Sequence, residues 1–284
     1  MLGLWSCARA PNIDGHPPAP TALRSGHATV IRLQPYQGRL RAMQARAADR
    51  EWLLLFDTGG GTTVISPALA QALGCAPRGS VTGYRMSGDP ITMPTCAGGA
   101  LVLDDWRAPS QTLAIFDVMT LLPRGWPRVD GVIALRSFAG HRLTLDLAAN
   151  AVMVHDTRAA SVDALRADAK RLLGRLATGP SGAELLAFAG MVAGADTLWL
   201  EVDSGNLDAV LLAPHTARLL GVSDSVGAQH RDLALPLVPG QPATVLARVR
   251  TLIFDGALNA AWLEQGRLTI DLVDGSLWWE AHTH

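Results

Sequence analysis

The feature that most constrains the fold of this chain is an internal duplication. The stretch W-L-L-L-F-D-T-G, which carries Asp57, is matched by W-L-E-V-D-S-G, which carries Asp203. Each is followed by a hydrophobic pair, a proline and a short helix-like stretch that ends at glycine. A second pair of blocks, D-G-V-I-A-L-R-S-F-A-G-H-R-L-T-L-D-L from Asp130 and D-G-A-L-N-A-A-W-L-E-Q-G-R-L-T-I-D-L from Asp255, aligns without a gap. Because chance does not place two such blocks twice in the same order, the sequence predicts two units of one plan.

The segments within each unit indicate short strands. Stretches such as H-A-T-V-I-R-L-Q-P and G-A-L-V-L-D-D alternate apolar and polar residues, which is typical of half-buried strands. The stretch between the units has apolar residues at helical spacing and ends at Gly-Pro, which favours a surface-packed linker helix. We therefore predict a mostly β protein of two similar lobes. Its parts are a tail (1–26), a first lobe (27–157), a linker helix (158–182) and a second lobe (183–284).

Composition and charge narrow the classes of function. A chain of 284 residues with 49% hydrophobic and 17% charged residues can bury a substantial core. The net charge of −1 gives no electrostatic reason to expect nucleic acid as a partner. The histidines show no ligand-like pair on a helix face and the cysteines lack metal-type spacing, so we expect no metal and no cofactor.

The N-terminus and the three cysteines bear on location. Leu-Trp-Ser before Cys7 resembles a lipoprotein cleavage site, and a Pro-rich stretch that suits a tether follows it. We expect a monomer in the periplasm or cell envelope with a lipid anchor at Cys7; a cytoplasmic location is the alternative if that resemblance is accidental. Cys75 and Cys96 are then either a disulfide, which an oxidising compartment permits, or two buried thiols.

The two strand-end aspartates need an explanation, because burying an isolated carboxylate is costly. A pseudo-twofold axis that relates the two units brings Asp57 and Asp203 together. Two carboxyls at close range share one proton, so one can activate a water while the other polarises an amide carbonyl. We expect the hydroxyls of Thr58 and Ser204 to hydrogen-bond across this axis and lock the two turns together.

These turns resemble the active-site loops of the aspartic peptidases, a well-known example of two carboxyls that share one proton. F-D-T-G-G and V-D-S-G-N match the loops, and D-G-V-I-A-L and D-G-A-L-N-A look like the second signature of the family. The resemblance covers roughly residues 27–284. It is closest to bacterial retropepsin-like peptidases, with both lobes fused in one chain as in pepsin-like enzymes. It implies two β-barrel-like lobes around a pseudo-twofold axis, with the active site between them.

The resemblance also assigns roles to individual residues. It implies an endopeptidase that acts on a peptide or protein substrate, with Asp57 and Asp203 as the catalytic pair. The residues that hold the pair would be Thr58, Gly59, Ser204 and Gly205. A hairpin would close over the substrate as a flap, with Gly83 and Tyr84 near its tip. An exposed turn aromatic is the alternative interpretation of Tyr84.

Four positions depart from the family pattern. Gly60 and Asn206 stand where the family has Ala, Ser or Thr, and Ala134 and Asn259 stand where its second signature has glycine. The two catalytic carboxyls that the resemblance implies are kept, but these four changes are compatible with a peptidase activity that is narrowed or lost. Besides the endopeptidase, a catalytically impaired peptide-binding protein of the same fold therefore stays open. A structural envelope protein is disfavoured, because it gives no reason for both aspartates.

Overall fold

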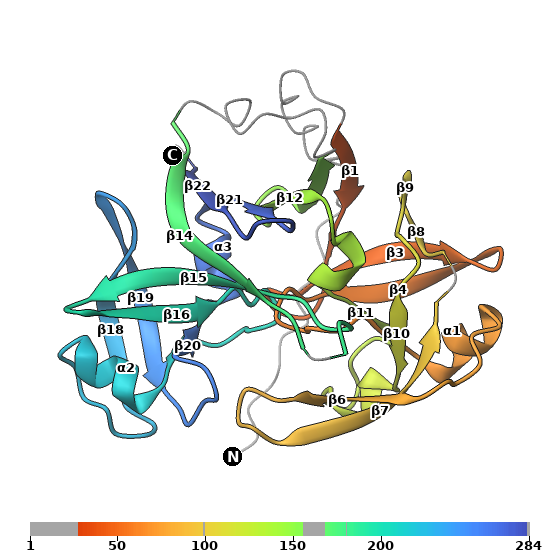
Figure 1. The fold of residues 1–284 in the computed structure, drawn as a ribbon, viewed down its shortest axis with the longest axis horizontal. Coiled ribbons are helices and arrows are strands. Elements are labelled where there is room, and N and C mark those ends of the chain that lie inside the picture. Colours follow the sequence, from red (N-terminus) through yellow and green to blue (C-terminus); the bar gives the residue numbers. More distant parts are fainter. Residues whose placement is uncertain (1–27, 99, 156–167, 180, 283–284) are drawn as a thin grey trace, which may run out of the picture.

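The computed structural model describes residues 28–98, 100–155, 168–179 and 181–282, and strands dominate it (Figure 1). The helices are short: α1 (Pro67–Ala72), α2 (Pro214–Leu219), α3 (Ala260–Leu263), and the 3-10 turns η1 (Val118–Thr120) and η2 (Leu135–Phe138). The prediction of a mostly β protein is confirmed. In the part of the chain described, no helix is long and apolar enough to cross a membrane.

The first unit provides a ten-stranded sheet, which lies on the right of Figure 1. In strand order it is β6 (Ser80–Tyr84), β7 (Pro90–Ala97), β10 (Thr112–Ile115), β5 (Val64–Ile65), β11 (Gly131–Ile133), β4 (Arg50–Phe56), β3 (Arg41–Ala47), β8 (Val102–Leu103) and β9 (Trp106–Arg107), with β2 (Gln34–Pro35) on β3. The disulfide between Cys75 and Cys96 ties the segment after α1 to β7. Of the two states that the sequence leaves open for these cysteines, the structure has the disulfide.

A twelve-stranded sheet joins the two units. In order it is β1 (Ala28–Arg32), β13 (Ala151–His155), β12 (Arg142–Asp146), β21 (Gly266–Asp271), β22 (Leu277–Ala281), β14 (Lys170–Ala177), β15 (Leu186–Ala193), β16 (Asp196–Glu201), β20 (Gly256–Ala257), β17 (Val210–Leu212), β19 (Gln241–Val249) and β18 (Gln229–Val238). Its first three strands belong to the first unit. Figure 1 shows β1, β12, β21 and β22 at the top, between the lobes. One hydrophobic cluster runs through both units.

The duplication is visible in three dimensions. In each unit the strand that leads to the aspartate turn pairs in parallel with a short strand of the second block: β4 with β11, and β16 with β20. The carboxylate of Asp130 accepts the N–H of Leu53 in β4 at 3.4 Å. The carboxylate of Asp255 accepts the N–H of Trp199 in β16 at 2.7 Å. The aspartate of each repeated Asp-Gly block therefore has the same role in both halves: it binds the strand that leads to the aspartate turn.

The pseudo-twofold axis passes between β12 and β21, which pair antiparallel. At the centre of this pairing two hydroxyls lie 2.8 Å apart, those of Thr144 and Thr269. On either side an arginine of one unit pairs with an aspartate of the other: Arg142 with Asp271 at 3.0 Å, and Arg267 with Asp146 at 2.7 Å. Each unit thus neutralises a buried carboxylate of its twin.

The predicted linker helix is wrong over its described part. Residues 170–177 form β14, which pairs with β22 through Leu172 and Leu277 and with β15 through Leu176 and Ala187. The sequence K-R-L-L-G-R-L-A fits a helical and an alternating pattern equally well over so few residues. Pairing on both edges decides in favour of the strand, because it satisfies the backbone N–H and C=O groups. Residues 158–167 of the predicted helix, the tail and Cys7 lie outside the described residues.

Candidate active site

Two equivalent turns meet at the axis. Asp57 directly follows β4, and Asp203 comes two residues after β16. The backbone N–H of Thr58 donates to Oγ of Ser204 at 3.0 Å, and the N–H of Ser204 donates to Oγ1 of Thr58 at 2.9 Å. Each hydroxyl also donates to a backbone carbonyl of the opposite unit. The hydroxyl of Thr58 donates to the carbonyl of Val202 at 2.6 Å, and that of Ser204 donates to the carbonyl of Phe56 at 3.3 Å. The expected bonds across the axis are present.

The glycines after the aspartates bring the two carboxyls together. The N–H of Gly59 donates to Oδ1 of Asp57 at 2.9 Å, and the N–H of Gly205 donates to Oδ1 of Asp203 at 2.8 Å. A Cβ atom on Gly59 would lie 2.5 Å from Cγ of Asp203, and one on Gly205 would lie 2.6 Å from Cγ of Asp57. Each carboxyl therefore packs against the turn of the opposite unit, where only a residue without a side chain fits.

The two carboxyls differ in environment. Asp57 is partly exposed, and burial raises its pKa while hydrogen bonds from Asp203 and from backbone N–H groups lower it. Asp203 is 5% exposed. Burial, and then the negative charges of Asp57 and Glu201, raise the pKa of Asp203 well above its ordinary value. Burial thus raises the pKa of both carboxyls, and Asp203 is the more enclosed of the two.

A third carboxyl, that of Glu201, lies near the pair and is not among the predicted site residues. Its side chain is 2% exposed. Burial, and then the charge of Asp57, raise the pKa of Glu201 to about 8. The signal was present in W-L-E-V-D-S-G, because alternation along a strand places Glu201 on the same face as Asp203. The matching residue of the first unit is Leu55.

The two asparagines that depart from the family pattern have local structural roles. The side-chain amide of Asn206 donates to the carbonyls of Ala209 and Leu258 at 3.1 and 3.3 Å, while its backbone N–H donates to Asp203 at 3.1 Å. Asn259 caps α3: its Oδ1 accepts the N–H of Trp262 at 2.9 Å. Both amides are thus engaged in turns and caps.

The first unit uses different groups at the matching places. Gly60 lies in an exposed turn, where its N–H donates to the carbonyl of Asp57 at 3.3 Å. Ala134 is buried, and its N–H donates to the hydroxyl of Thr63 at 3.2 Å. No hydroxyl therefore follows the glycine of either aspartate turn, and both carboxyls rely on backbone N–H donors.

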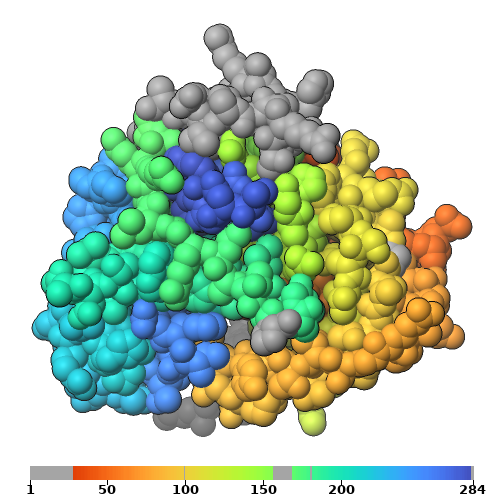
Figure 2. All heavy atoms as spheres, viewed as in Figure 1, coloured from red at the N-terminus to blue at the C-terminus, as the bar shows by residue number. Residues whose placement is uncertain are grey.

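The predicted hairpin exists and reaches the second unit. β6 and β7 pair antiparallel, and the turn that joins them spans residues 85–89. Tyr84 ends β6 beside this turn and is 64% exposed. The carbonyl of Met86 accepts the N–H of Ile253 at 3.0 Å, so the turn is bonded to the segment before β20. In Figure 2 the orange hairpin runs along the lower edge of the molecule and meets this blue segment.

Glu184 lies between the hairpin and the first aspartate turn. A Cβ atom on Gly83 would be 3.7 Å from Oε1 of Glu184, and one on Gly61 would be 3.9 Å from its Cβ. The N–H of Leu185 donates to the carbonyl of Gly61 at 3.0 Å. Burial raises the pKa of Glu184. This segment of the second unit therefore places the hairpin next to the aspartate turns.

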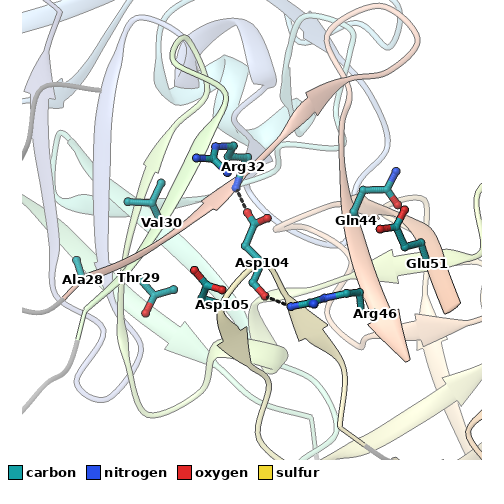
Figure 3. Close-up of a pocket in the computed structure, with 9 residues that line it drawn as sticks. All are labelled: Ala28, Thr29, Val30, Arg32, Gln44, Arg46, Glu51, Asp104 and Asp105. Atoms are coloured by element: carbon teal, nitrogen blue, oxygen red, sulfur yellow. Dashed lines mark hydrogen bonds between the residues drawn. The ribbon is translucent and has the colours of Figure 1, made fainter. Parts of the chain in front are cut away.

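A cavity of about 610 Å³ lies elsewhere, between β1, β3, β4 and the turn from β8 to β9 (Figure 3). Within it the N–H of Arg32 donates to the carboxylate of Asp104 at 2.6 Å, and the guanidinium of Arg46 donates to the carbonyl of Asp104 at 3.0 Å. Its lining mixes both charges and includes neither aspartate of the pair. Among the described residues, no group of three or more His, Cys, Asp or Glu side chains is placed to hold a metal ion.

Comparison with known proteins agrees with this geometry. No protein-family model matches the sequence, and no curated protein matches it. The crystal structure of an aspartic proteinase from Irpex lacteus is similar, with a TM-score of 0.54 and 11% identity, over 90% of this chain and 98% of that one. The structure of basic 7S globulin from soybean has a TM-score of 0.52 and 10% identity, over 91% of this chain and 96% of that one.

The chain therefore has the two-lobed, pepsin-like fold of the aspartic peptidases, which confirms the fold class predicted from the sequence. In strand order both of its large sheets are open. One of the two similar structures is named a globulin, and the other a proteinase. Function must accordingly be argued from the residues of the site, because a shared fold does not establish a shared activity.

Proposed function

We propose that this protein is an aspartic endopeptidase that hydrolyses peptide bonds with a water held between Asp57 and Asp203. The observation that carries the proposal is the reciprocal packing of the pair. Each carboxyl accepts the N–H of its own glycine and lies against the glycine of the opposite turn. A duplicated scaffold that places two carboxyls in this way serves a reaction that needs one acid and one base at the same point.

The asymmetry of the pair assigns the two tasks. Asp57, the more exposed carboxyl, acts as the ionised base, and Asp203, the more enclosed one, carries the proton. Asp57 takes a proton from the water as its oxygen bonds to the carbonyl carbon, and Asp203 gives its proton to the carbonyl oxygen. As the C–N bond breaks, Asp57 passes its proton to the leaving nitrogen and Asp203 recovers one from a hydroxyl. Both carboxyls return to their starting states.

The β6–β7 hairpin supports an extended peptide as the substrate. The hairpin belongs to the first unit, and its turn is bonded to the second unit through Met86 and Ile253. A chain that enters between the units has to displace this bond, and the hairpin then closes over it. We assign substrate contacts of this flap to Gly83 and Tyr84, and the exposure of the Tyr84 ring supports that assignment.

The second candidate is a peptide-binding protein of the same fold that does not turn over. It is favoured by the absence of a hydroxyl at Gly60 and Asn206 and by the similarity to a protein named as a globulin. The arrangement of the aspartates disfavours it, because a binding cleft has no need of two glycines fitted to opposite carboxyls.

Cleavage of a diverse peptide library from pH 3 to 8 tests the proposal. We expect cuts by the wild type and none by Asp57→Asn or Asp203→Asn. Asp49→Asn is the matched control: Asp49 has a φ of 57°, which asparagine tolerates, and lies outside the site. Cuts that persist in either site variant would assign them to another centre. A folded wild type that binds a non-cleavable hydroxyl-bearing peptide but cuts nothing would establish the second candidate.

We further propose that the protein works in the periplasm or cell envelope. The Cys75–Cys96 disulfide supports this location, because disulfides persist in oxidising compartments. Cell fractionation and thiol counting on the isolated protein test it. A protein found in the cytoplasm with both thiols free would contradict it.

A further inference from the structure

The duplicated site contains one carboxyl that has no twin. Building on the proposed peptidase function, we propose that Glu201 is a positioning residue of the reaction: its carboxyl keeps the shared proton on Asp203 and leaves Asp57 as the base. Glu201 touches neither substrate nor water in this scheme. It acts through Asp203, and its effect is to extend the working range of the pair toward higher pH.

The placement of Glu201 follows from the register of β16. The N–H of Val202 donates to the carbonyl of Ala187 at 2.9 Å, so the extended pairing with the β15 side continues one residue beyond β16. Glu201 and Asp203 flank Val202 and therefore project to the same side. The side chain of Glu201 is 2% exposed, and it stands where the first unit has Leu55. Two otherwise equivalent turns thus differ by a buried carboxyl beneath one of them. A charged group rarely replaces a core leucine without a consequence for its neighbours.

The residues across both neighbouring strands are apolar. Glu201 is paired with Phe188 of β15 on one side and with Ala257 of β20 on the other. Phe254 packs edge-on against Phe188, with ring centroids 5.1 Å apart. This surrounding favours the uncharged form of the carboxyl, since the side chains of Phe188 and Ala257 offer no hydrogen-bond donor to a carboxylate.

The charged side chains on the elements next to Glu201 have partners of their own. Arg175 of β14 lies over aromatic rings, 4.5 Å from the centroid of Trp199 and 5.2 Å from that of Phe188. Asp255, which precedes β20, is bonded through its carboxylate to the N–H of Trp199 and to His215. The charge that acts on Glu201 is that of Asp57, and Glu201 in turn acts on Asp203.

Three neighbouring carboxyls in an apolar setting lose their protons in sequence. Asp57 ionises before Asp203, because it is the more exposed of the two. Once Glu201 is ionised, its negative charge opposes ionisation of Asp203, the more enclosed member of the pair. The form with one proton on Asp203, which the reaction needs, therefore survives to a higher pH than it would beside a leucine.

The first test is the pH dependence of kcat/KM for a peptide found by the library screen. Glu201→Gln removes the charge and keeps the shape, and Glu201→Leu copies the first unit. For both we expect the alkaline limb to move down by about one pH unit or more, because a neighbouring charge shifts a buried pKa by at least that much. Glu201→Asp keeps a carboxyl and should restore part of the range. Leu55→Met, a change of packing alone at the matching place, should leave the limb where it is.

The second test does not depend on activity. Carboxyl carbons labelled with 13C report each ionisation by NMR in the intact protein. We expect Asp203 to release its proton at a lower pH in Glu201→Gln than in the wild type, and Glu201 itself to titrate near pH 8. Should Glu201→Gln not fold, Glu201→Leu and the wild-type titration of Glu201 answer the same question.

The outcomes separate the two proposals. A lowered Asp203 titration without any cleavage supports the effect of Glu201 on the proton of Asp203 and refutes the peptidase. Cleavage with an alkaline limb and an Asp203 titration that are unchanged in both variants overturns the role of Glu201 and leaves the peptidase standing. A limb that shifts equally in Leu55→Met would also overturn it, since packing alone would then explain the effect.

Discussion

The two halves of the site have the same backbone geometry in their aspartate turns and differ in the side chains beside the carboxyls. Beneath the first turn lies Leu55, and Asp57 remains partly exposed. Beneath the second lies Glu201, and Asp203 is enclosed. The bonds from the two glycine N–H groups to the carboxyls, and the bonds from the N–H groups of Thr58 and Ser204 across the axis, nevertheless match within a few tenths of an ångström. A duplication thus preserves what the turn geometry requires, while the side chains beside the carboxyls are free to differ between the units.

The largest effect on activity is expected from changes to the two glycines, where the two halves are most alike. In Gly59→Ala or Gly205→Ala the added Cβ atom would meet the opposite carboxyl at about 2.5 Å, so the pair must separate. We expect each to lose at least about 100-fold in kcat/KM, as misplacement of a reacting group by about 1 Å does. Gly60→Ala is the control, since its nearest atom would be 3.3 Å away. A Gly205→Ala enzyme as active as the control would show that the packing of the pair is not needed.

The next largest effect is on the stability of the fold and concerns the second unit, which carries Glu201. Because the pKa of Glu201 is raised in the folded state to about 8, its contribution to stability is complete below the unfolded pKa and is lost as pH rises through about 8. Glu201→Leu should therefore be more stable than the wild type at pH 9 by up to a few kcal/mol, at about 1.4 kcal/mol per pKa unit. The gain should shrink toward pH 4. Urea unfolding across this range measures it, and a gain that is independent of pH would refute the ionisation argument.

Removal of the bonds across the axis should have a smaller and symmetric effect. Thr58→Val and Ser204→Ala each delete a buried hydroxyl that accepts an N–H of the other turn. We expect each to lower the free energy of unfolding by about 1–3 kcal/mol, because a buried donor is left unpaired. Chemical denaturation of both variants and of the double variant checks this. Effects that add fully in the double variant would show that the two bonds are not one coupled unit.

The smallest effect is expected at the β6–β7 hairpin, where the first unit reaches across to the second. Ile253→Pro deletes the N–H that donates to Met86, whereas Ile253→Ala keeps it and removes the side chain. We expect a few-fold change in KM with the proline variant, together with faster hydrogen exchange in residues 85–89, because the turn loses its bond to the second unit. Equal exchange in both variants would show that the contact of the side chain, rather than the backbone bond, holds the hairpin.

Much of this arrangement was predictable from the sequence, because it depends on local and repeated patterns. The duplication predicted the pairing of Asp57 with Asp203, and the resemblance to the aspartic peptidases predicted the hairpin. β14 was not predictable in the same way, since its eight residues suit a helix as well as a strand and only its neighbours on both edges decide. Tertiary pairing outweighed local periodicity there.

Other features could not be predicted from the sequence because they depend on which distant parts of the chain pack together. The alternation of β16 already placed Glu201 beside Asp203, but its burial depends on the apolar residues that β15 and β20 bring from elsewhere in the chain. The state of Cys75 and Cys96 likewise depends on how close α1 and β7 pack. The family departures at Asn206 and Asn259 could not be explained until their partners in the turn and the cap were known.

The sheet that joins the two units has a consequence for the way this protein is made. β12 cannot find its partner β21 until the ribosome has produced the residues from 147 to beyond 271. During that interval the first unit exposes an unpaired strand edge, which is a ready template for wrong association. A second copy of the first unit could occupy that edge through the same arginine–aspartate exchange. Newly made chains are therefore most vulnerable to mispairing with one another while the second half is still being synthesised, and slow translation of that half should lower the yield of folded protein.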